Sequence, residues 1–315
     1  MTSRKGSLRA SGASAVQASP IGIFDSGIGG LTVFKETRRE LPGEDIVYFG
    51  DTAHLPYGTK SKETITKFSI DNVNFLQSFG VKVVIVACNT ASSLSLDALK
   101  EKFTLPIIGV IEPGARQALK KTRNHRIGVI GTKATIGSGS YESCLKKLDP
   151  RVKVYSEACP LFVPLVEEGW LDGDVVNKVA RAYLDPMKSF GIDTLILGCT
   201  HYPLLAGVIQ KILGPNVRLI NSAEETAKEA KRLLDRLKLR STKKKSPELR
   251  FYVSDEPEPF RVLGERFLEH SIRQVTKVGD HLISVENQDG VIVGSMTRPS
   301  GTMRINTAAV PAKRG

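Results

Sequence analysis

Cysteine is rare in this chain, with four residues among 315, and no two of them form a C-x-x-C pair. The absence of such pairs argues against a zinc knuckle or a thioredoxin-type redox motif. Four cysteines are also too few for a disulfide scaffold in a chain of this length. We therefore expect free thiols and a cytoplasmic protein. The four residues are Cys88, Cys144, Cys159 and Cys199.

Long apolar runs are absent as well, since no stretch approaches the ~18 uninterrupted apolar residues of a membrane span. The N-terminus carries Lys5 and Arg9 but no apolar segment, so we expect no secretory signal and no contact with a membrane. Apolar residues make up 41% and charged residues 25%, as in ordinary globular proteins. At ~100–200 residues per domain, the length predicts two domains.

The net charge of +12 is concentrated in three segments. Residues 1–19 contribute +3, residues 236–250 contribute +6 and residues 283–315 contribute +2. Basic segments attract nucleic acid and anionic surfaces, which leaves a nucleic-acid-binding or regulatory protein as one alternative. Because the rest of the chain is nearly neutral, a solvated loop and two frayed tails explain the charge better. Nucleic acid is therefore not the partner we expect.

Short apolar runs alternate with helix-length segments from Pro20 onward. Several runs are apolar throughout, which is typical of strands buried on both faces of a parallel sheet. Segment 61–79 instead carries its apolar residues near one face of a helix. Strand, helix, strand in this order predicts an α/β fold with parallel sheets. The predicted strands cover residues 21–24, 46–49, 83–87, 107–110, 127–130, 194–198, 217–220 and 251–253.

Two pairs of similar segments, in the same order in each half of the chain, indicate an internal duplication. Residues 21–26 (IGIFDS) resemble residues 127–132 (IGVIGT), and residues 84–90 (VIVACNT) resemble residues 195–201 (LILGCTH). Ligands of open parallel sheets bind beyond the carboxyl ends of the strands, where both cysteines lie. The duplication predicts two pseudo-symmetric lobes, each a mainly parallel sheet flanked by helices. Cys88 and Cys199 would then meet from opposite sides of the cleft between the lobes.

Two opposed thiols suit the inversion of a carbon stereocentre. This reaction removes a proton on one face and returns it on the other, so it needs two bases. Both cysteines precede segments expected to be helical, whose N-termini favour the thiolate. Asp25 and His201 lie near the two thiols and could tune proton transfer. The isolated Cys144 and Cys159 are expected to be core residues.

Other roles for the thiol pair fit less well. A disulfide between them does not suit the expected compartment. A metal site would want more ligands than His201 adds, so we expect no metal. A pyridoxal enzyme would need a Schiff-base lysine, and Lys133, the lysine within these segments, is a poor candidate. We expect no cofactor.

Two loops are candidates for ligand binding. Segment 25–30 (DSGIGG) follows a strand and opens a helix, where backbone N–H groups can hold an anion. It lacks the Rossmann glycine spacing and a Walker A lysine, so a small carboxylate is a better ligand than a nucleotide. Segment 51–58 (DTAHLPYG) suits a rigid loop that offers backbone donors and the Tyr57 phenol. Ordinary turns are the alternative for both.

Together these segments resemble the glutamate racemase family, cofactor-independent enzymes that supply D-glutamate for peptidoglycan. The resemblance runs from about residue 20 to residue 282, and ACNTAS and GCTHYPLL are its most specific parts. It departs from the family pattern at His54 and Leu55, where another basic residue and an aromatic residue are usual. The matching segments are IGIFDSGIGGLTV, FGDTAHLPYG, VIVACNTASS, IGVIEPG, IGVIGTKATI, CPLFVPLVEEG, LILGCTHYPLL and LINSAEETA.

The resemblance implies roles for individual residues. Cys88 would exchange the α-proton of D-glutamate with help from Asp25, and Cys199 that of L-glutamate with help from His201. Tyr57 and Gly58 would hold the side-chain carboxylate, and Glu168 would lie near the second half-site. The implied substrate-binding residues are Asp25, Ser26, Tyr57, Gly58, Asn89, Thr90, Thr132, Thr135, Thr200 and His201.

We divide the chain accordingly into a disordered tail (1–19), a first lobe (20–112 plus 223–282), a second lobe (113–222) and a flexible C-terminal tail (283–315). A homodimer is expected, because apolar helix faces would otherwise stay exposed. Racemization of aspartate or another amino acid by the same thiol pair is an alternative, although DSGIGG and PYG favour glutamate. A binding module that has lost the chemistry is a weaker alternative, since both cysteines are present.

Overall fold

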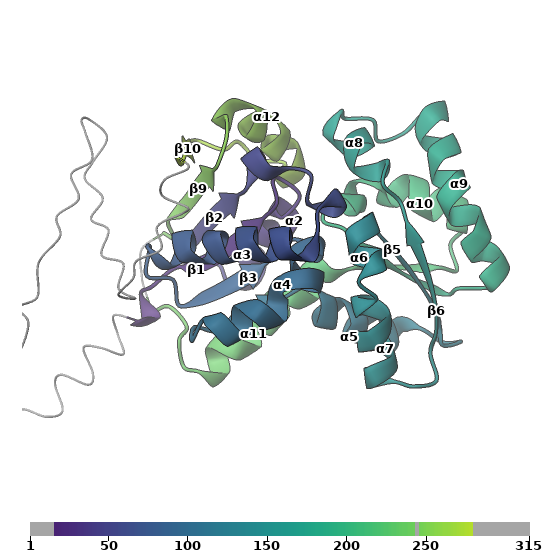
Figure 1. Ribbon diagram of the computed structural model, residues 1–315, viewed down its shortest axis with the longest axis horizontal. Helices are drawn as coiled ribbons and strands as arrows, with labels where there is room; N and C mark the ends of the chain where they lie inside the picture. The colour runs from purple at the N-terminus through teal and green to yellow at the C-terminus, as the bar shows by residue number, and fades with distance from the viewer. Residues whose placement is uncertain (1–15, 243–245, 280–315) are drawn as a thin grey trace, which may run out of the picture.

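The computed structural model describes residues 16–242 and 246–279. They form two sheets, each built of parallel strands and covered by helices, that lie side by side (Figure 1). Residues 1–15 and 283–315, which we assigned to tails, lie outside the described residues. The chain is anchored before the expected start at Pro20, because the Gln17 carbonyl accepts a hydrogen bond from Lys82 at 2.8 Å. The Gln17 side-chain amide also donates to the Lys238 carbonyl at 3.0 Å.

The first sheet contains six strands in the order β10-β9-β2-β1-β3-β4. Helices α3 and α4 pack on one face, and α2, α11 and α12 pack on the other. Its central strands are buried on both faces, as continuous apolar runs predict. The strands are β1 (Ile21–Asp25), β2 (Ile46–Gly50), β3 (Val83–Val86), β4 (Ile107–Gly109), β9 (Leu249–Val253) and β10 (Val275–Lys277); the helices are α2 (Leu31–Glu40), α3 (Lys62–Gln77), α4 (Asn89–Lys102), α11 (Ser222–Arg236) and α12 (Pro257–Leu268).

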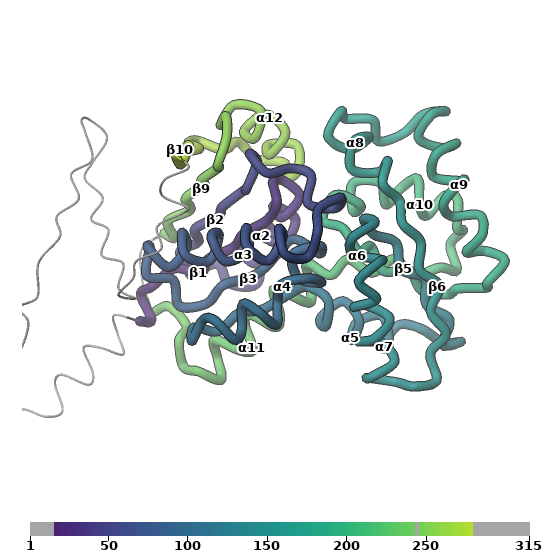
Figure 2. The backbone as a smooth tube through the Cα atoms, viewed as in Figure 1, coloured from purple at the N-terminus to yellow at the C-terminus, as the bar shows by residue number. Residues whose placement is uncertain are grey.

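The second sheet contains four strands in the order β6-β5-β7-β8. The chain enters it through α5 and returns to the first sheet through α11, as the tube in Figure 2 shows. The strands are β5 (Arg126–Gly131), β6 (Lys153–Ala158), β7 (Thr194–Gly198) and β8 (Arg218–Asn221); the helices are α5 (Ile111–Lys121), α6 (Lys133–Gly137), α7 (Ser140–Leu148), α8 (Phe162–Glu167), α9 (Asp174–Phe190) and α10 (Ala206–Leu213). Three short 3₁₀ turns are η1 (Thr52–His54), η2 (Tyr57–Thr59) and η3 (Tyr202–Leu205).

The strand orders confirm the predicted duplication. The series β2-β1-β3-β4 in the first sheet has the same connectivity as β6-β5-β7-β8 in the second, and all pairs are parallel. Cys88 follows β3 and Cys199 follows the equivalent strand β7. The exact lobe boundaries at 112/113 and 222/223 stay predictions.

Local signals explain several element boundaries. Ser61 caps α3 by accepting a hydrogen bond from the Thr64 N–H at 3.3 Å. Thr132 caps α6 in the same way, and Gly191 ends α9 in the left-handed conformation that glycine adopts without strain. None of the helices in the described parts of the chain is long and apolar enough to cross a membrane.

The basic segment 236–250 is partly neutralised by the fold. Arg240 forms an ion pair with Asp235 at 3.1 Å, and the Arg250 guanidinium lies 5.2 Å from the centre of the Phe79 ring. Residues 243–245 lie outside the described residues. Arg240 and Arg250 of this basic segment therefore contact other residues of the first lobe.

Candidate active site

Cys88 stands at the junction of β3 and α4, where its sulfur caps the helix. Its Sγ accepts a hydrogen bond from the Ala91 N–H at 3.5 Å and lies 3.7 Å from Oγ of Ser26. Burial raises the pKa of this thiol to about 12, and the nearby Asp25 carboxylate adds to the shift. The N–H at the helix terminus favours the thiolate, as expected, but desolvation outweighs this one contact and leaves the pKa of Cys88 raised.

Asp25 ends β1 and is completely buried. One carboxylate oxygen, Oδ2, accepts a hydrogen bond from the Gly27 N–H at 2.9 Å. The other, Oδ1, has no hydrogen-bond partner among the described residues. Burial raises the pKa of Asp25, although the charge of His201 opposes the shift. A carboxyl with a raised pKa accepts a proton more readily near neutral pH, which suits an assisting role beside Cys88.

Cys199 follows β7 and lies beside His201. The Sγ atom is 3.9 Å from Nδ1 of His201, and Nε2 of the same ring is 3.0 Å from Oε1 of Glu167. Burial by itself lowers the pKa of His201, but the interactions with Cys199 and Glu167 outweigh it and raise the pKa to about 10. The raised pKa favours the charged form of the histidine next to the second thiol.

The helix predicted after Cys199 begins later than expected. The 3₁₀ turn η3 comes first, and α10 starts only at Ala206. The N-terminus of α10 therefore does not lie at Cys199, whose nearest titratable neighbour is His201.

The predicted acid of the second half-site is displaced by one residue. Glu167 contacts His201, whereas Glu168 is exposed at the end of α8. The apolar pattern of α8 could have distinguished the two glutamates. Phe162 and Val166 face the core. Because successive helical residues point about 100° apart, Glu167 and Glu168 point in different directions from this buried face. Glu167 is thus the acid beside His201, and the sequence analysis did not name it.

Three threonine hydroxyls join the two lobes. Oγ1 of Thr90, which follows β3, lies 3.0 Å from Oγ1 of Thr132 and 3.2 Å from that of Thr135, both in the second lobe. The neighbouring Asn89 donates to the Tyr141 hydroxyl at 2.8 Å, while its buried Oδ1 has no partner among the described residues. A buried amide oxygen without a partner is free to accept a hydrogen bond from a ligand.

The loop of residues 51–58 is held by Asp51. Its Oδ2 accepts the Tyr57 hydroxyl at 2.5 Å, and its Oδ1 accepts from Ser254 at 2.9 Å. Asn72 also donates to the Tyr57 hydroxyl, at 3.2 Å. The phenol predicted to contact a ligand is therefore buried and used within the protein. The backbone groups of Tyr57 and Gly58 remain the candidate donors.

Two glycines let the lobes approach each other closely. A Cβ added to Gly29 would overlap Oγ1 of Thr200 and lie 2.6 Å from Nδ1 of His201. A Cβ added to Gly58 would lie 2.7 Å from Cβ of Thr132. Both glycine loops of the first lobe thus touch the predicted site residues of the second. Except for Glu168, the predicted site residues gather where the carboxyl ends of the two sheets meet.

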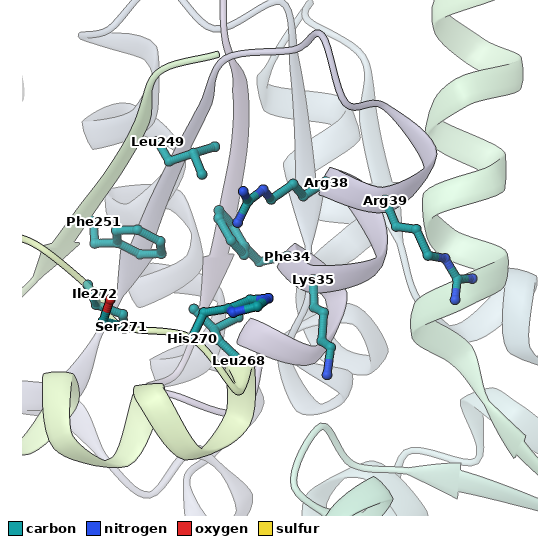
Figure 3. A pocket seen from close by; sticks show the side chains of 10 residues that line it. All are labelled: Phe34, Lys35, Arg38, Arg39, Leu249, Phe251, Leu268, His270, Ser271 and Ile272. Carbon is teal, nitrogen blue, oxygen red and sulfur yellow. The ribbon is translucent and has the colours of Figure 1, made fainter. Parts of the chain in front are cut away.

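A separate cavity of 340 Å³ lies between α2, β9 and the segment that follows α12 (Figure 3). None of the predicted site residues lines it. Two of its cationic side chains are already paired, Lys35 with Glu269 at 3.1 Å and Arg39 with Glu36 at 2.7 Å. Within residues 16–242 and 246–279, no cluster of three or more His, Cys, Asp or Glu side chains is arranged to hold a metal ion.

Comparisons with known proteins agree with this geometry. The Asp/Glu/Hydantoin racemase family profile matches residues 29–230. The chain is 50% identical to a glutamate racemase from Geobacter metallireducens over 82% of this chain and 96% of that protein. It resembles the structure of glutamate racemase isoform RacE1 from Bacillus anthracis, with a TM-score of 0.80, 45% identity, and coverage of 83% and 98% of the two chains. It also resembles glutamate racemase from Francisella tularensis in complex with D-glutamate, with a TM-score of 0.78, 45% identity, and coverage of 83% and 97%.

Proposed function

The chain belongs to the Asp/Glu/Hydantoin racemase family as a glutamate racemase, and we propose that it inverts the α-carbon of glutamate with the thiols of Cys88 and Cys199. The observation that carries the proposal is the placement of these residues at equivalent strand ends of two duplicated sheets. The two half-sites adjoin each other, because Ser26 lies 3.7 Å from the Cys88 sulfur and Gly29 of the same loop lies against His201. A glutamate bound between them presents one face of its α-carbon to each thiol.

In the L-to-D direction, Cys199 acts as the base and Cys88 as the acid. The Cys199 thiolate, beside the charged His201, takes the α-proton of L-glutamate, so that the Cα–H bond breaks and an S–H bond forms. The carbanion then takes the proton of Cys88, which burial keeps in its neutral thiol form at neutral pH. D-glutamate leaves, with Cys88 as thiolate and Cys199 as thiol.

The D-to-L direction runs through the same groups with reversed roles. Cys88 must first lose its proton, and Asp25 is the neighbouring carboxylate with a raised pKa. Asp25 accepts the proton and the Cys88 thiolate then removes the α-proton of D-glutamate. The Cys199 thiolate takes a proton from the charged His201 beside it and returns that proton to the carbanion on the opposite face. His201 and Asp25 thus assist one thiol each.

Glutamate needs partners for two carboxylates and one ammonium group. The amide oxygen of Asn89 and the hydroxyls of Thr90, Thr132 and Thr135 are polar groups suited to the amino-acid end. The backbone N–H groups of Tyr57 and Gly58, with Ser26, suit the side-chain carboxylate. Thr200 completes the second side next to His201. These assignments extend the resemblance residue by residue, and the contacts described above support them.

The first test follows the α-proton and the optical activity together. Purified protein, a thiol reductant and D-glutamate are incubated in D₂O without pyridoxal phosphate or added metal. We expect the α-proton NMR signal and the optical rotation to disappear in parallel, because each inversion incorporates a solvent deuteron. Loss of neither signal would overturn the proposal. Turnover of aspartate but not glutamate would instead indicate the alternative substrate.

The biological setting is proposed on the same grounds. D-glutamate would supply peptidoglycan synthesis, and the four free cysteines suit the cytoplasm. We also propose a homodimer, because large apolar side chains around α8 and α9 are exposed, including Leu161, Trp170 and Val175 at 51%, 53% and 51%. Sedimentation at several protein concentrations tests this assembly, and a monomer throughout would contradict it.

A further inference from the structure

Tyr48 lies directly beneath the glycine-rich loop of the first lobe. It occupies the middle of β2, is completely buried and packs its ring against Phe34, Phe251 and Phe260. Two of these rings, Phe34 and Phe251, also line the cavity of Figure 3. The hydroxyl leaves this apolar cluster and donates a hydrogen bond to the Gly27 carbonyl at 2.9 Å. A phenol buried among aromatic rings requires such a partner.

Gly27 connects this hydroxyl to the Cys88 half-site. While its carbonyl accepts from Tyr48, its N–H donates to Oδ2 of Asp25 at 2.9 Å. The carbonyl also lies tightly against Gly50, since a Cβ on Gly50 would be 2.6 Å from the Gly27 oxygen. Both hydrogen-bonding groups of Gly27 are therefore fixed, one by the sheet below and one by the carboxylate above.

The Tyr48 hydroxyl stays a donor over the working pH range. Burial raises its pKa well above 10, and the charges of Asp25 and Cys88 raise it further. The space around it is also tight, because a Cβ on Gly30 would lie 2.9 Å from the phenol oxygen and 2.5 Å from Cβ of Asp25. The loop cannot shift toward β2 without meeting this side chain.

We infer that Tyr48 is a positioning residue for the Cys88 half-reaction: by holding the Gly27 carbonyl, it keeps Asp25 and Ser26 aimed at the Cys88 thiol. The inference rests on the proposed two-thiol reaction. It assigns Tyr48 no contact with the substrate. The residue acts through the Gly27 backbone, whose N–H binds Asp25. Because this loop contacts Thr200 and His201 at Gly29 and not at Gly27, the effect of Tyr48 falls on the proton transfer at Cys88.

This confinement has a kinetic signature. The two enantiomers have equal free energies in water, so any variant changes kcat/KM by the same factor in both directions. A variant that raises only the barrier for proton transfer at Cys88 nevertheless makes this transfer the rate-limiting step of racemization. Deuterium on the α-carbon of D-glutamate is moved by Cys88, whereas deuterium on L-glutamate is moved by Cys199. A defect at Cys88 must therefore change the two isotope effects in opposite directions.

The experiment compares Tyr48→Phe with the native enzyme, using α-deuterated D- and L-glutamate. Removal of the hydroxyl keeps the ring and its packing, and we expect kcat/KM to fall by up to about tenfold, the usual range for one hydrogen bond. The primary isotope effect on kcat/KM should rise with D-glutamate and fall with L-glutamate. Because an isotope effect is a ratio of rates, it does not depend on the fraction of folded protein.

Tyr252→Phe serves as the matched control. Tyr252 lies on the neighbouring strand β9 with its ring against Phe75 and Phe79 on the other face of the sheet, so its isotope effects should equal those of the native enzyme. Unchanged or equally changed isotope effects in Tyr48→Phe would overturn the inference and leave a purely structural role. If the native enzyme does not racemize glutamate at all, the proposed function fails instead.

Discussion

Gly29 and His201 come from different lobes, yet a single methyl group on Gly29 would stand 2.6 Å from Nδ1 of the histidine. The same methyl would overlap the Thr200 hydroxyl. The close approach of the two lobes at the second half-site therefore requires a residue without a side chain at position 29.

This contact predicts a severe defect for Gly29→Ala. We expect kcat/KM to fall by about 10² or more, since displacing a catalytic group by 1 Å costs this much. Gly207→Ala is the control, because the position in α10 is helical and has no atom within 4 Å of the added Cβ. This control should keep full activity and gain a few tenths of a kcal/mol in stability, up to about 1 kcal/mol. Equal activities of the two variants would contradict the contact.

The adjacent pair of Glu167 and Glu168 allows a closely matched comparison. In Glu167→Gln a neutral amide replaces the carboxylate that faces Nε2 of His201. The pKa of the histidine should therefore fall from about 10. The alkaline limb of the pH profile should shift to lower pH, with a loss in kcat of about tenfold. Glu168→Gln changes the same chemical group at an exposed position and should leave the pH profile unaltered. A larger effect from Glu168→Gln would restore the original assignment.

Single replacement of either thiol should separate exchange from inversion. We expect Cys88→Ala and Cys199→Ala each to lower the racemization rate by about 10²–10⁴, the usual contribution of a general base. In D₂O, Cys199→Ala should still exchange the α-proton of D-glutamate without inverting it, and Cys88→Ala should do so with L-glutamate. Cys144→Ala, in the partly exposed α7, should behave as the native enzyme. Racemization by either active-site variant at the native rate would contradict the two-thiol mechanism.

His201 also predicts how stability depends on pH. Its pKa rises from an ordinary 6.5 to about 10 on folding, so the folded state binds the proton more tightly. The stabilisation is complete below pH 6.5 and is lost as the pH rises through 10. Urea midpoints of the native enzyme should therefore fall between pH 7 and pH 10 more steeply than those of His201→Asn. Parallel curves for the two proteins would show that the histidine is not charged in the folded state.

The strands that line the site are the part of the fold that the sequence predicts best. Residues 83–86 and 194–198 are continuous apolar runs, and both form central strands. The edge strands β6 and β10 were not predicted, because β6 is half-exposed and β10 is three residues long. Their pairing depends on a neighbour distant in sequence, which no local pattern encodes.

The sequence predicts which strand end each site residue follows, but it does not predict which groups surround each side chain. The sequence places Cys88 at a helix N-terminus, yet the raised pKa comes from burial by segments that only the fold assembles. Likewise, Tyr57 lies in the predicted loop, but the sequence does not show that Asp51 of the same loop and Asn72 of α3 both bind its hydroxyl. Which of two adjacent glutamates faces His201 depends on how α8 packs.

The repeated strand order β2-β1-β3-β4 and β6-β5-β7-β8 bears on how a chiral chain can treat mirror-image molecules evenly. A polypeptide of L-amino acids cannot contain a mirror plane. An approximate rotation axis between two copies of one unit is the nearest operation available, since it exchanges the thiols together with the faces of the α-carbon. The rotation is inexact, with a carboxyl on one side and an imidazole on the other. In the proposed mechanism, this inequality makes the two proton transfers unequal, but it cannot alter the even mixture reached at equilibrium.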